Sequence, residues 1–112
     1  MKVFITSQNP VLDSAVDKRF GRCPWLILFD DETNQWEALE NPGSSQSGGA
    51  GIAAAQFVVD KKADVVISGD FGPNASSALK AANIEMLIFS DTTVSVQDAL
   101  DQYQKKQLKK FC

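Results

Sequence analysis

The chain has 112 residues, a formal net charge of −3, 44% hydrophobic residues and 22% charged residues. These values are typical of one globular domain with its own hydrophobic core, so we expect a single domain over residues 1–112. No apolar run approaches the roughly 20 residues that a membrane span needs, and the apolar stretch at the N-terminus is too short for a secretory signal, so we expect a cytoplasmic protein.

The first half of the chain is typical of strands. Residues 2–7 predict a strand, and residues 25–30 and 35–41 predict two more, joined by the turn formers of residues 31–34. The strand at 25–30 is continuously apolar, which indicates a central position, whereas 35–41 alternates and belongs nearer an edge. Residues 8–24 lack periodicity but contain scattered apolar side chains, so we expect an ordered, packed loop.

From residue 42 onward, helices alternate with buried apolar strands. A Gly/Ser-rich loop over residues 42–51 leads into a helix of small residues. Ser95 and Asp98 form a near capping box at the start of the last helix. The elements predicted after the loop are helix 52–62, strand 63–69, helix 73–83, strand 84–90 and helix 95–111.

Four lysines lie near the end of the last predicted helix. Residues 1–60 carry four basic and eight acidic groups, a charge of −4, and residues 61–112 carry seven and six, a charge of +1. Cations at the end of a helix complement its macrodipole. Because the chain as a whole is acidic, we favour this interpretation over a nucleic-acid patch and expect no nucleic-acid partner.

The predicted element order is βββαβαβα. The first three strands form an antiparallel meander, and the later strands are connected by right-handed parallel crossovers. This order predicts an α/β fold, with one mixed sheet of five strands and helices on its faces. The sequence contains no internal repeat and no low-complexity tail.

The chain has no histidine and two cysteines, Cys23 and Cys112. Two cysteines do not complete a four-ligand zinc site, and the absence of histidine removes the commonest metal ligand and general base. Cys112 is the last residue, which favours a frayed, exposed thiol. A disulfide between the two cysteines is disfavoured in a reducing compartment.

The stretch SGGAGIAAA places Gly49, Gly51 and Ala54 at the G-x-G-x-x-A spacing of a dinucleotide fingerprint, with Asp70 downstream. A true fingerprint follows a buried strand directly, and this chain has too few strands after its front for a full dinucleotide domain. Residues 47–51 still suit an anion, because glycines allow close backbone approach and a helix N-terminus is partly positive. Glycines that only permit close helix–sheet packing are the alternative.

Three aspartates, Asp30, Asp70 and Asp91, each follow a predicted strand. Ligands in open α/β sheets bind at the carboxyl ends of strands, so these carboxylates suggest a magnesium site. Acidic residues also cap turns and helices, and no convergent spacing favours the metal.

Both arginines, Arg19 and Arg22, lie just before Cys23 in the stretch DKRFGRCPW. Guanidinium groups are permanently charged and suit anions, and a thiolate beside them would be a soft metal ligand. The alternative is structural: the arginines pair with Asp13 or Asp17, and the cysteine fills space in the core.

Four segments together resemble the dinitrogenase iron–molybdenum cofactor biosynthesis proteins and their stand-alone single-domain relatives. The segments are LDSAVDKRFGRCPWLILFD, NPGSSQSGGAGIAAAQFVVD, ADVVISGDFGPNASSALKAANIEM and VQDALD, in order over nearly the whole chain. The patterns RFGR, GGAGI and GPNA are specific in combination. The resemblance implies a ribonuclease-H-like, three-layer α/β/α fold, whose mixed five-stranded sheet has its second strand antiparallel to the others.

The resemblance also implies a non-enzymatic role, the binding or carriage of an anionic metal–sulfur cluster of the Fe–Mo–S, Fe–S or Mo–Cu–S type. A cluster-donating or cluster-accepting protein would be the partner, and the oligomeric state stays open. Binders in this family use histidine or cysteine as metal ligand, and here only Cys23 is placed for that role. The residues assigned to the cluster by resemblance are Arg19, Phe20, Gly21, Arg22, Ser47, Gly48, Gly49, Ala50, Gly51, Gly72 and Asn74.

Two other classes of function stay open. A regulatory or protein-interaction domain that kept the fold without the cofactor is consistent with the absence of histidine. A nucleotide- or magnesium-dependent enzyme is consistent with the glycine loop and the strand-end aspartates, but it lacks a convincing catalytic base.

Overall fold

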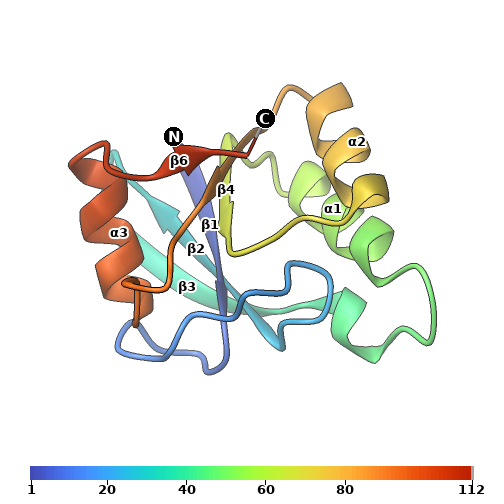
Figure 1. Cartoon of the computed structure of the whole chain (residues 1–112), viewed down its shortest axis with the longest axis horizontal. Helices are drawn as coiled ribbons and strands as arrows, with labels where there is room; N and C mark the ends of the chain where they lie inside the picture. Colours follow the sequence, from blue (N-terminus) through green and yellow to red (C-terminus); the bar gives the residue numbers. More distant parts are fainter. Residues whose placement is uncertain (112) are drawn as a thin grey trace.

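The computed structural model describes residues 1–111, so the expectations for Cys112, including its pairing with Cys23, lie outside the described residues. Figure 1 shows a sheet with helices on both sides. The strands are β1 (Lys2–Ser7), β2 (Trp25–Asp30), β3 (Gln35–Glu40), β4 (Val65–Ser68), β5 (Glu85–Ile88) and β6 (Lys109–Lys110). The helices are the 3-10 turn η1 (Pro42–Ser45), α1 (Ala50–Asp60), α2 (Pro73–Ala81) and α3 (Val96–Gln104).

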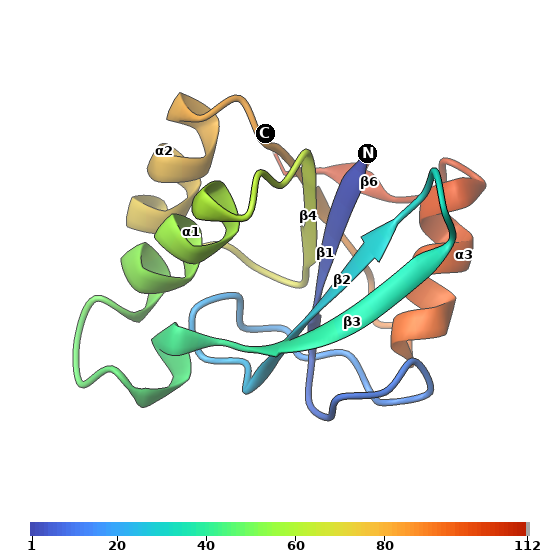
Figure 2. The ribbon, with the colours of Figure 1, turned by 180° about the vertical axis from the view of Figure 1, so that it is seen from behind.

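The strands form one sheet in the order β3-β2-β1-β4-β5-β6. β1, β4 and β5 run parallel, β2 is antiparallel to both of its neighbours, and β6 is antiparallel to β5. The apolar β4 lies near the centre and is buried along its whole length, whereas the largely exposed β3 forms one edge, as its alternation predicts (Figure 2). The α/β class and the antiparallel second strand are confirmed.

The sheet has six strands instead of the predicted five, because the last helix ends earlier than expected. Lys106 adopts a left-handed conformation with a φ of 58°, and its amide donates to the carbonyl of Tyr103. The amide of Gln107 donates to the carbonyl of Gln102, which completes the bond pair of a Schellman C-cap. The chain then reverses and adds β6 beside β5.

The prediction that four lysines gather at the end of a helix is therefore wrong for two of them. Lys105 is the C-cap of α3 and Lys106 follows it, whereas Lys109 and Lys110 lie in β6. The ammonium of Lys110 lies 3.8 Å from a carboxylate oxygen of Glu85 on the neighbouring strand. Two lysines thus lie at the helix end, where the dipole favours cations, and two belong to an edge strand.

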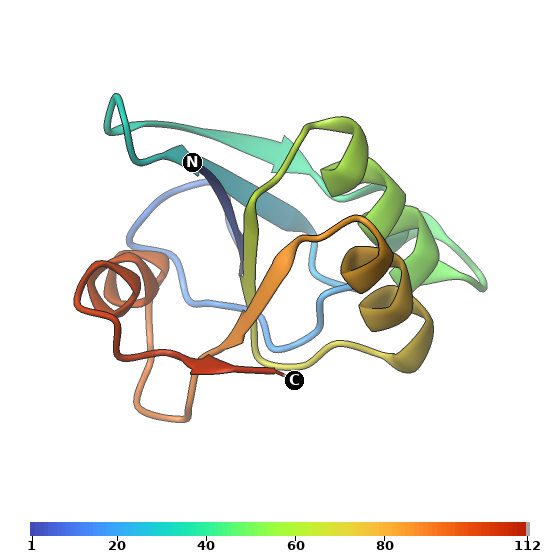
Figure 3. The same ribbon diagram turned by 90° about the horizontal axis from the view of Figure 1, so that it is seen from above.

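The molecule has three layers. α1 and α2 cover one face of the sheet and α3 covers the other (Figure 3). Successive residues of a strand point to opposite faces, so Phe4 joins the core beneath α1 and α2, while Ile5 joins the core beneath α3. Leu79 of α2 and Leu100 of α3 are each at most 2% exposed, and they close the two cores.

The long loop after β1 is ordered and packed, as predicted. Isolated bridges pair Ser7 with Val16, Ala15 with Ser95, and Arg19 with Asp70. The loop therefore runs from the start of α3 to the segment between β4 and α2, across the carboxyl ends of the parallel strands. Within residues 1–111, no helix has the length and apolar composition that crossing a bilayer requires.

Candidate functional site

A hollow of about 590 Å³ opens at the carboxyl ends of β1 and β4. Three segments that are distant in sequence line it: the loop that carries both arginines, the start of α1, and the turn that leads into α2. Ligands of open α/β sheets bind at this end of the strands. The lining residues are Lys18, Arg19, Phe20, Gly21, Arg22, Gly49, Ala50, Gly51, Ile52, Gly69, Asp70, Gly72, Pro73, Asn74 and Ala75.

α1 begins at this hollow without a side-chain cap. It starts at Ala50, two residues earlier than predicted, because Gly49 takes a left-handed conformation with a φ of 71° that glycine adopts without strain. No acidic residue lies in the first turn. The N–H groups at the start of α1 are thus available to an external acceptor, and the helix dipole adds partial positive charge there.

α2 begins at the same hollow and is also without a side-chain cap. Its N-cap is Gly72, Pro73 follows in the first turn, and no acidic residue accompanies them. The two helix starts touch, since a Cβ added to Gly51 would lie 3.2 Å from the Cβ of Ala75. Two partly positive helix ends therefore converge on one hollow.

Glycines at the rear of the hollow let main chain pack directly on main chain. A Cβ on Gly21 would lie 2.8 Å from the backbone nitrogen of Gly51. A Cβ on Gly43 would collide with the carbonyl oxygens of Gly21 and Ala50. This packing fixes the arginine loop against α1, and it accounts for Gly21 and Gly43 as close-packing residues.

Arg19 is held by a carboxylate. Its Nε and Nη2 donate to the two oxygens of Asp17 at 3.1 and 3.0 Å, and its backbone amide donates to the same carboxylate. Asp17 is only 3% exposed. The ion pair raises the pKa of Arg19 above its ordinary value, chiefly through these hydrogen bonds. The pairing with Asp17 that the sequence offered as an alternative is confirmed.

Arg22 has a different environment. Its Nη1 donates to the carbonyl of Gln46 in the exposed segment before α1, so the guanidinium bridges the arginine loop and the rim of the hollow. Within residues 1–111 no carboxylate pairs with Arg22. Its charge is therefore not neutralised by a neighbouring acid.

Cys23 lies in the core and does not line the hollow. The side chain is 0% exposed, and burial raises the pKa of its thiol to about 12. The thiol contacts the amide nitrogen of Asn41 at 3.3 Å and the carbonyl of Phe20 at 3.5 Å. A buried neutral thiol packs as a small apolar group, which is the structural alternative considered from the sequence.

Asn41 positions the loop, and the sequence reasoning missed it. Its side-chain amide donates to the carbonyls of Phe20 and Cys23 at 3.1 and 2.9 Å, and its Oδ1 accepts from the amide of Gly43 at 3.0 Å. The signal was the Asn41-Pro42 pair, a turn initiator at the end of a predicted strand.

Two of the remaining sequence-predicted site residues line the hollow, and two lie outside its lining. Phe20 is 1% exposed and packs on Phe71 with ring centroids 5.3 Å apart, so it forms a floor. Asn74 lies exposed on the lining. Ser47 and Gly48 are exposed beyond the lining, and a Cβ on Gly48 would meet nothing within 4 Å.

The three strand-end aspartates do not converge. Asp30 lies opposite Lys2 in the β1–β2 ladder, at the start of β1, because the antiparallel β2 ends at the opposite end of the sheet. Asp70 lines the hollow, whereas Asp91 lies outside it and pairs with Lys18. Over residues 1–111, no three groups among cysteine, aspartate and glutamate gather in a way that would hold a metal ion. The shared magnesium site is not formed.

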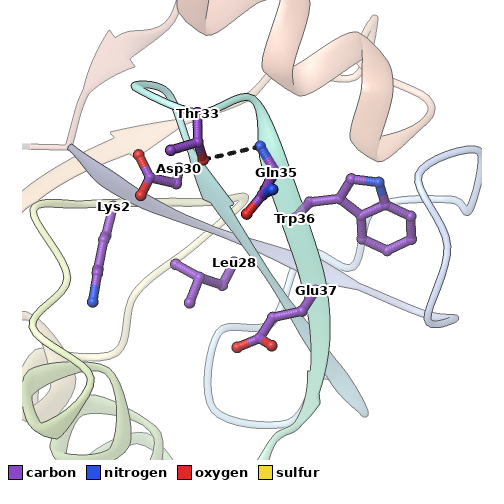
Figure 4. A pocket seen from close by; sticks show the side chains of 7 residues that line it. All are labelled: Lys2, Leu28, Asp30, Thr33, Gln35, Trp36 and Glu37. Atoms are coloured by element: carbon purple, nitrogen blue, oxygen red, sulfur yellow. Dashed lines mark hydrogen bonds between the residues drawn. The ribbon is translucent and has the colours of Figure 1, made fainter.

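A smaller depression of about 220 Å³ lies at the hairpin of β2 and β3 (Figure 4). The amide of Gln35 donates to Oγ1 of Thr33 there at 3.3 Å. Its charged groups, Lys2, Asp30 and Glu37, are of both signs, and no helix begins beside it. The hollow at the starts of α1 and α2 is the stronger candidate site.

The profile of the dinitrogenase iron-molybdenum cofactor family matches residues 1–106. The chain belongs to this family. The resemblance drawn from the sequence patterns is thus confirmed over nearly the whole chain.

Solved structures of similar proteins agree with the family and the fold. The apo form of the orange protein of Desulfovibrio gigas is 33% identical, with a TM-score of 0.90 over 97% of this chain and 91% of that one. A putative NifB protein of Thermotoga is 30% identical, with a TM-score of 0.84 over the same shares of the two chains. The uncharacterized protein MJ0580 of Methanocaldococcus jannaschii is 23% identical over 91% of this chain and 87% of its own.

Proposed function

We propose that the hollow between the arginine loop and the starts of α1 and α2 binds an anionic metal–sulfur cluster. The cluster would be of the Fe–Mo–S, Fe–S or Mo–Cu–S type, and the protein would carry it without a catalytic step. The observation that supports this most is the convergence of two uncapped helix starts and the carboxylate-free Arg22 on one hollow. The chain belongs to a family whose description names the iron–molybdenum cofactor, and this supports a metal–sulfur cluster as the anion.

The chemistry of the donors sets how the cluster is held. Main-chain N–H groups and guanidinium groups donate hydrogen bonds to sulfide or oxide, but they do not ligate a metal. Cys23 is buried away from the hollow with a neutral thiol, and the chain has no histidine. The guest would therefore arrive with its metals already bound by sulfide and be held by charge and hydrogen bonding.

The proposal is tested by anaerobic reconstitution. The protein is incubated with iron, molybdate and sulfide, or with copper and tetrathiomolybdate, and then separated from free reagents. We expect a protein-bound visible chromophore with a defined metal content. Arg22→Ala removes a charge-assisted hydrogen bond and weakens binding about 10- to 100-fold.

Two control variants sharpen this test. Lys80→Ala removes an exposed cation from the last turn of α2, far from the hollow, and leaves binding unchanged. Cys23→Ala retains the chromophore if the thiol only fills the core. Loss of the chromophore in a folded Cys23→Ala protein would restore the cysteine as a ligand, and equal binding by Arg22→Ala would contradict the site.

Carriage requires proteins that donate or accept the cluster, which we propose as the partners. Pull-down with the loaded protein should retain such a partner, and the metal should move between the two. A stoichiometric protein partner that binds the metal-free chain, with no metal in the complex, would instead support a regulatory domain that kept only the fold.

A further inference from the structure

The hollow has a third cation, Lys18, which the patterns in the sequence do not single out. Its backbone is fixed, because a Cβ on Gly69 would lie only 2.8 Å from the Cα of Lys18, and Ser68 Oγ donates to its carbonyl at 3.4 Å. Its side chain is 73% exposed. The residue therefore combines an anchored backbone position on the lining with an exposed ammonium group.

The ammonium of Lys18 is bound outside the hollow. It donates to Oδ1 of Asp91 at 3.1 Å, and Asp91 lies on the turn after β5, 93% exposed and outside the lining. The ammonium of Lys18 thus contacts a carboxylate that would compete for it with an anion in the hollow.

The three cations on the lining are balanced by Asp70 on the lining and by two carboxylates outside it. Lys18 is paired with Asp91 and Arg19 with Asp17, which leaves Arg22 and the carboxylate of Asp70. A multiply charged anion placed there would meet one unpaired cation and one unpaired carboxylate from side chains. A further cation is needed to balance such a guest.

Only one of the two ion pairs opens at little cost. Asp17 is 3% exposed and binds Arg19 through both oxygens, so separating them would leave a buried charge unpaired. Lys18 and Asp91 form a single contact between exposed groups, the kind of pair that contributes little to stability. An anion in the hollow therefore competes for Lys18 more readily than for Arg19.

We propose that Lys18 exchanges Asp91 for the bound anion, so that Lys18 sets the affinity and Asp91 acts as an internal competitor. This inference rests on the proposed anion-binding function. The exchange is an ionic one, with no bond formed or broken and no proton transferred.

The experiment is a double-mutant cycle with tetrathiomolybdate as the probe, whose binding is measured by its visible absorption in equilibrium dialysis. Asp91→Asn should tighten binding about two- to fivefold, because the exposed pair no longer holds the ammonium. Lys18→Gln should weaken binding about three- to tenfold and make it less sensitive to salt. In the Lys18→Gln protein, Asp91→Asn should change the affinity by less than about 1.5-fold.

Two controls separate this inference from other effects. Glu32→Gln makes the same change of charge at an 80% exposed site outside the hollow and should leave binding unchanged. Thermal unfolding confirms that each variant is folded. An Asp91→Asn effect that is equal with and without Lys18 overturns the exchange, because it would reflect net charge alone, and so does an Asp91→Asn protein that binds like wild type.

The outcomes distinguish the two levels of proposal. If wild type binds and Arg22→Ala weakens binding while Lys18 and Asp91 act independently, only the exchange is overturned. If the wild-type protein does not bind the probe at all, the proposed function falls, and this inference falls with it.

Discussion

The start of α3 and the starts of α1 and α2 are built in opposite ways. In α3, Ser95 Oγ accepts from the amide of Asp98 at 3.0 Å, and the Asp98 carboxylate accepts from the amide of Ser95 at 3.2 Å. α1 and α2 begin with Gly49 and Gly72, which offer no side-chain acceptor, and neither has an acid in its first turn. The predicted capping box is thus confirmed in α3, the one α-helix among residues 1–111 whose N-terminus lies away from the hollow.

The C-termini show that this difference is local. All three helices end with the amide pair of a Schellman motif, and the residues in left-handed conformation there are Lys62, Asn83 and Lys106. The three α-helices are therefore capped at their C-termini, and α3 is also capped at its N-terminus. The two starts without a side-chain cap occur together, at the hollow, and each loses about 0.3 kcal/mol of stability relative to a good cap. The comparison teaches that stability is lower where an anion would replace the missing caps.

The largest effect is expected where the hollow depends on backbone contact. Gly21→Ala places a Cβ 2.8 Å from the backbone of Gly51, which has no flexible atom to yield. We expect a loss of about 2–4 kcal/mol in the free energy of unfolding, measured by urea denaturation. Gly48→Ala is the matched control, since its Cβ meets nothing within 4 Å, and it should change stability by less than about 0.5 kcal/mol.

Removing the cap of α3 should have the next largest effect. Ser95→Ala leaves the amide of Asp98 without its acceptor and should cost about 1 kcal/mol of stability. Binding of tetrathiomolybdate should not change, because Ser95 does not line the hollow. Ser77→Ala, at an exposed serine within α2, is the control. A cost no greater than that of the control would mean that the capping box does not stabilise α3.

Adding an acid to α1 should separate stability from binding. Ile52 lies in the first turn, lines the hollow and is 46% exposed. Ile52→Glu complements the helix dipole, so unfolding free energy should rise by about 0.5 kcal/mol, while the affinity for tetrathiomolybdate should fall more than tenfold by repulsion. Ile52→Gln keeps the size without the charge. Equal binding by the two variants would place the guest away from α1.

The smallest effect is expected from a cap grafted onto α2. Gly72 has extended backbone angles, and a Cβ there meets nothing within 4 Å, so a serine fits as N-cap. Gly72→Ser should stabilise the protein by about 0.3 kcal/mol, seen as a small rise in Tm. Its hydroxyl would also compete for the free N–H groups and weaken probe binding severalfold. Unchanged binding would show that α2 contributes no hydrogen bond to the anion.

The sequence suggested that the glycines and arginines lie together, because close backbone approach and permanent charge belong to the residue types themselves, and most of them line the hollow. The pairing of Arg19 was narrowed only to Asp13 or Asp17, and the contact between Lys18 and Asp91 was not predicted, since both depend on which carboxylate lies within reach after folding. Asp30 was misplaced because it was grouped with the ends of the parallel strands, although the predicted antiparallel direction of β2 places its end at the opposite end of the sheet. Cys23 beside two arginines suggested an activated thiol, and burial decided otherwise.

Most of the fold could be predicted, and the exception has a local cause. The helix–strand alternation after residue 48 is carried by apolar periodicity, which the structure follows. The tail YQKKQLKKF is rich in helix formers and contains no glycine or proline to mark the end of α3. The left-handed residue that ends the helix is Lys106, and lysine is unusual in that conformation. Neither helix propensity nor the hydrophobic pattern therefore predicted the end of α3 or the strand β6.

The two edge strands of the sheet, β3 and β6, carry opposite charges, which affects whether the sheets of two copies can pair edge to edge in a concentrated solution. Glu37 and Glu40 lie along β3, whereas β6 consists of Lys109 and Lys110. If β3 of one copy paired with β3 of another, or β6 with β6, equal charges would lie side by side and repel each other. β3 and β6 attract each other, but the two residues of β6 offer too few backbone partners to extend the sheet into a fibre. The charge of both edge strands and the short length of β6 therefore both oppose edge-to-edge aggregation.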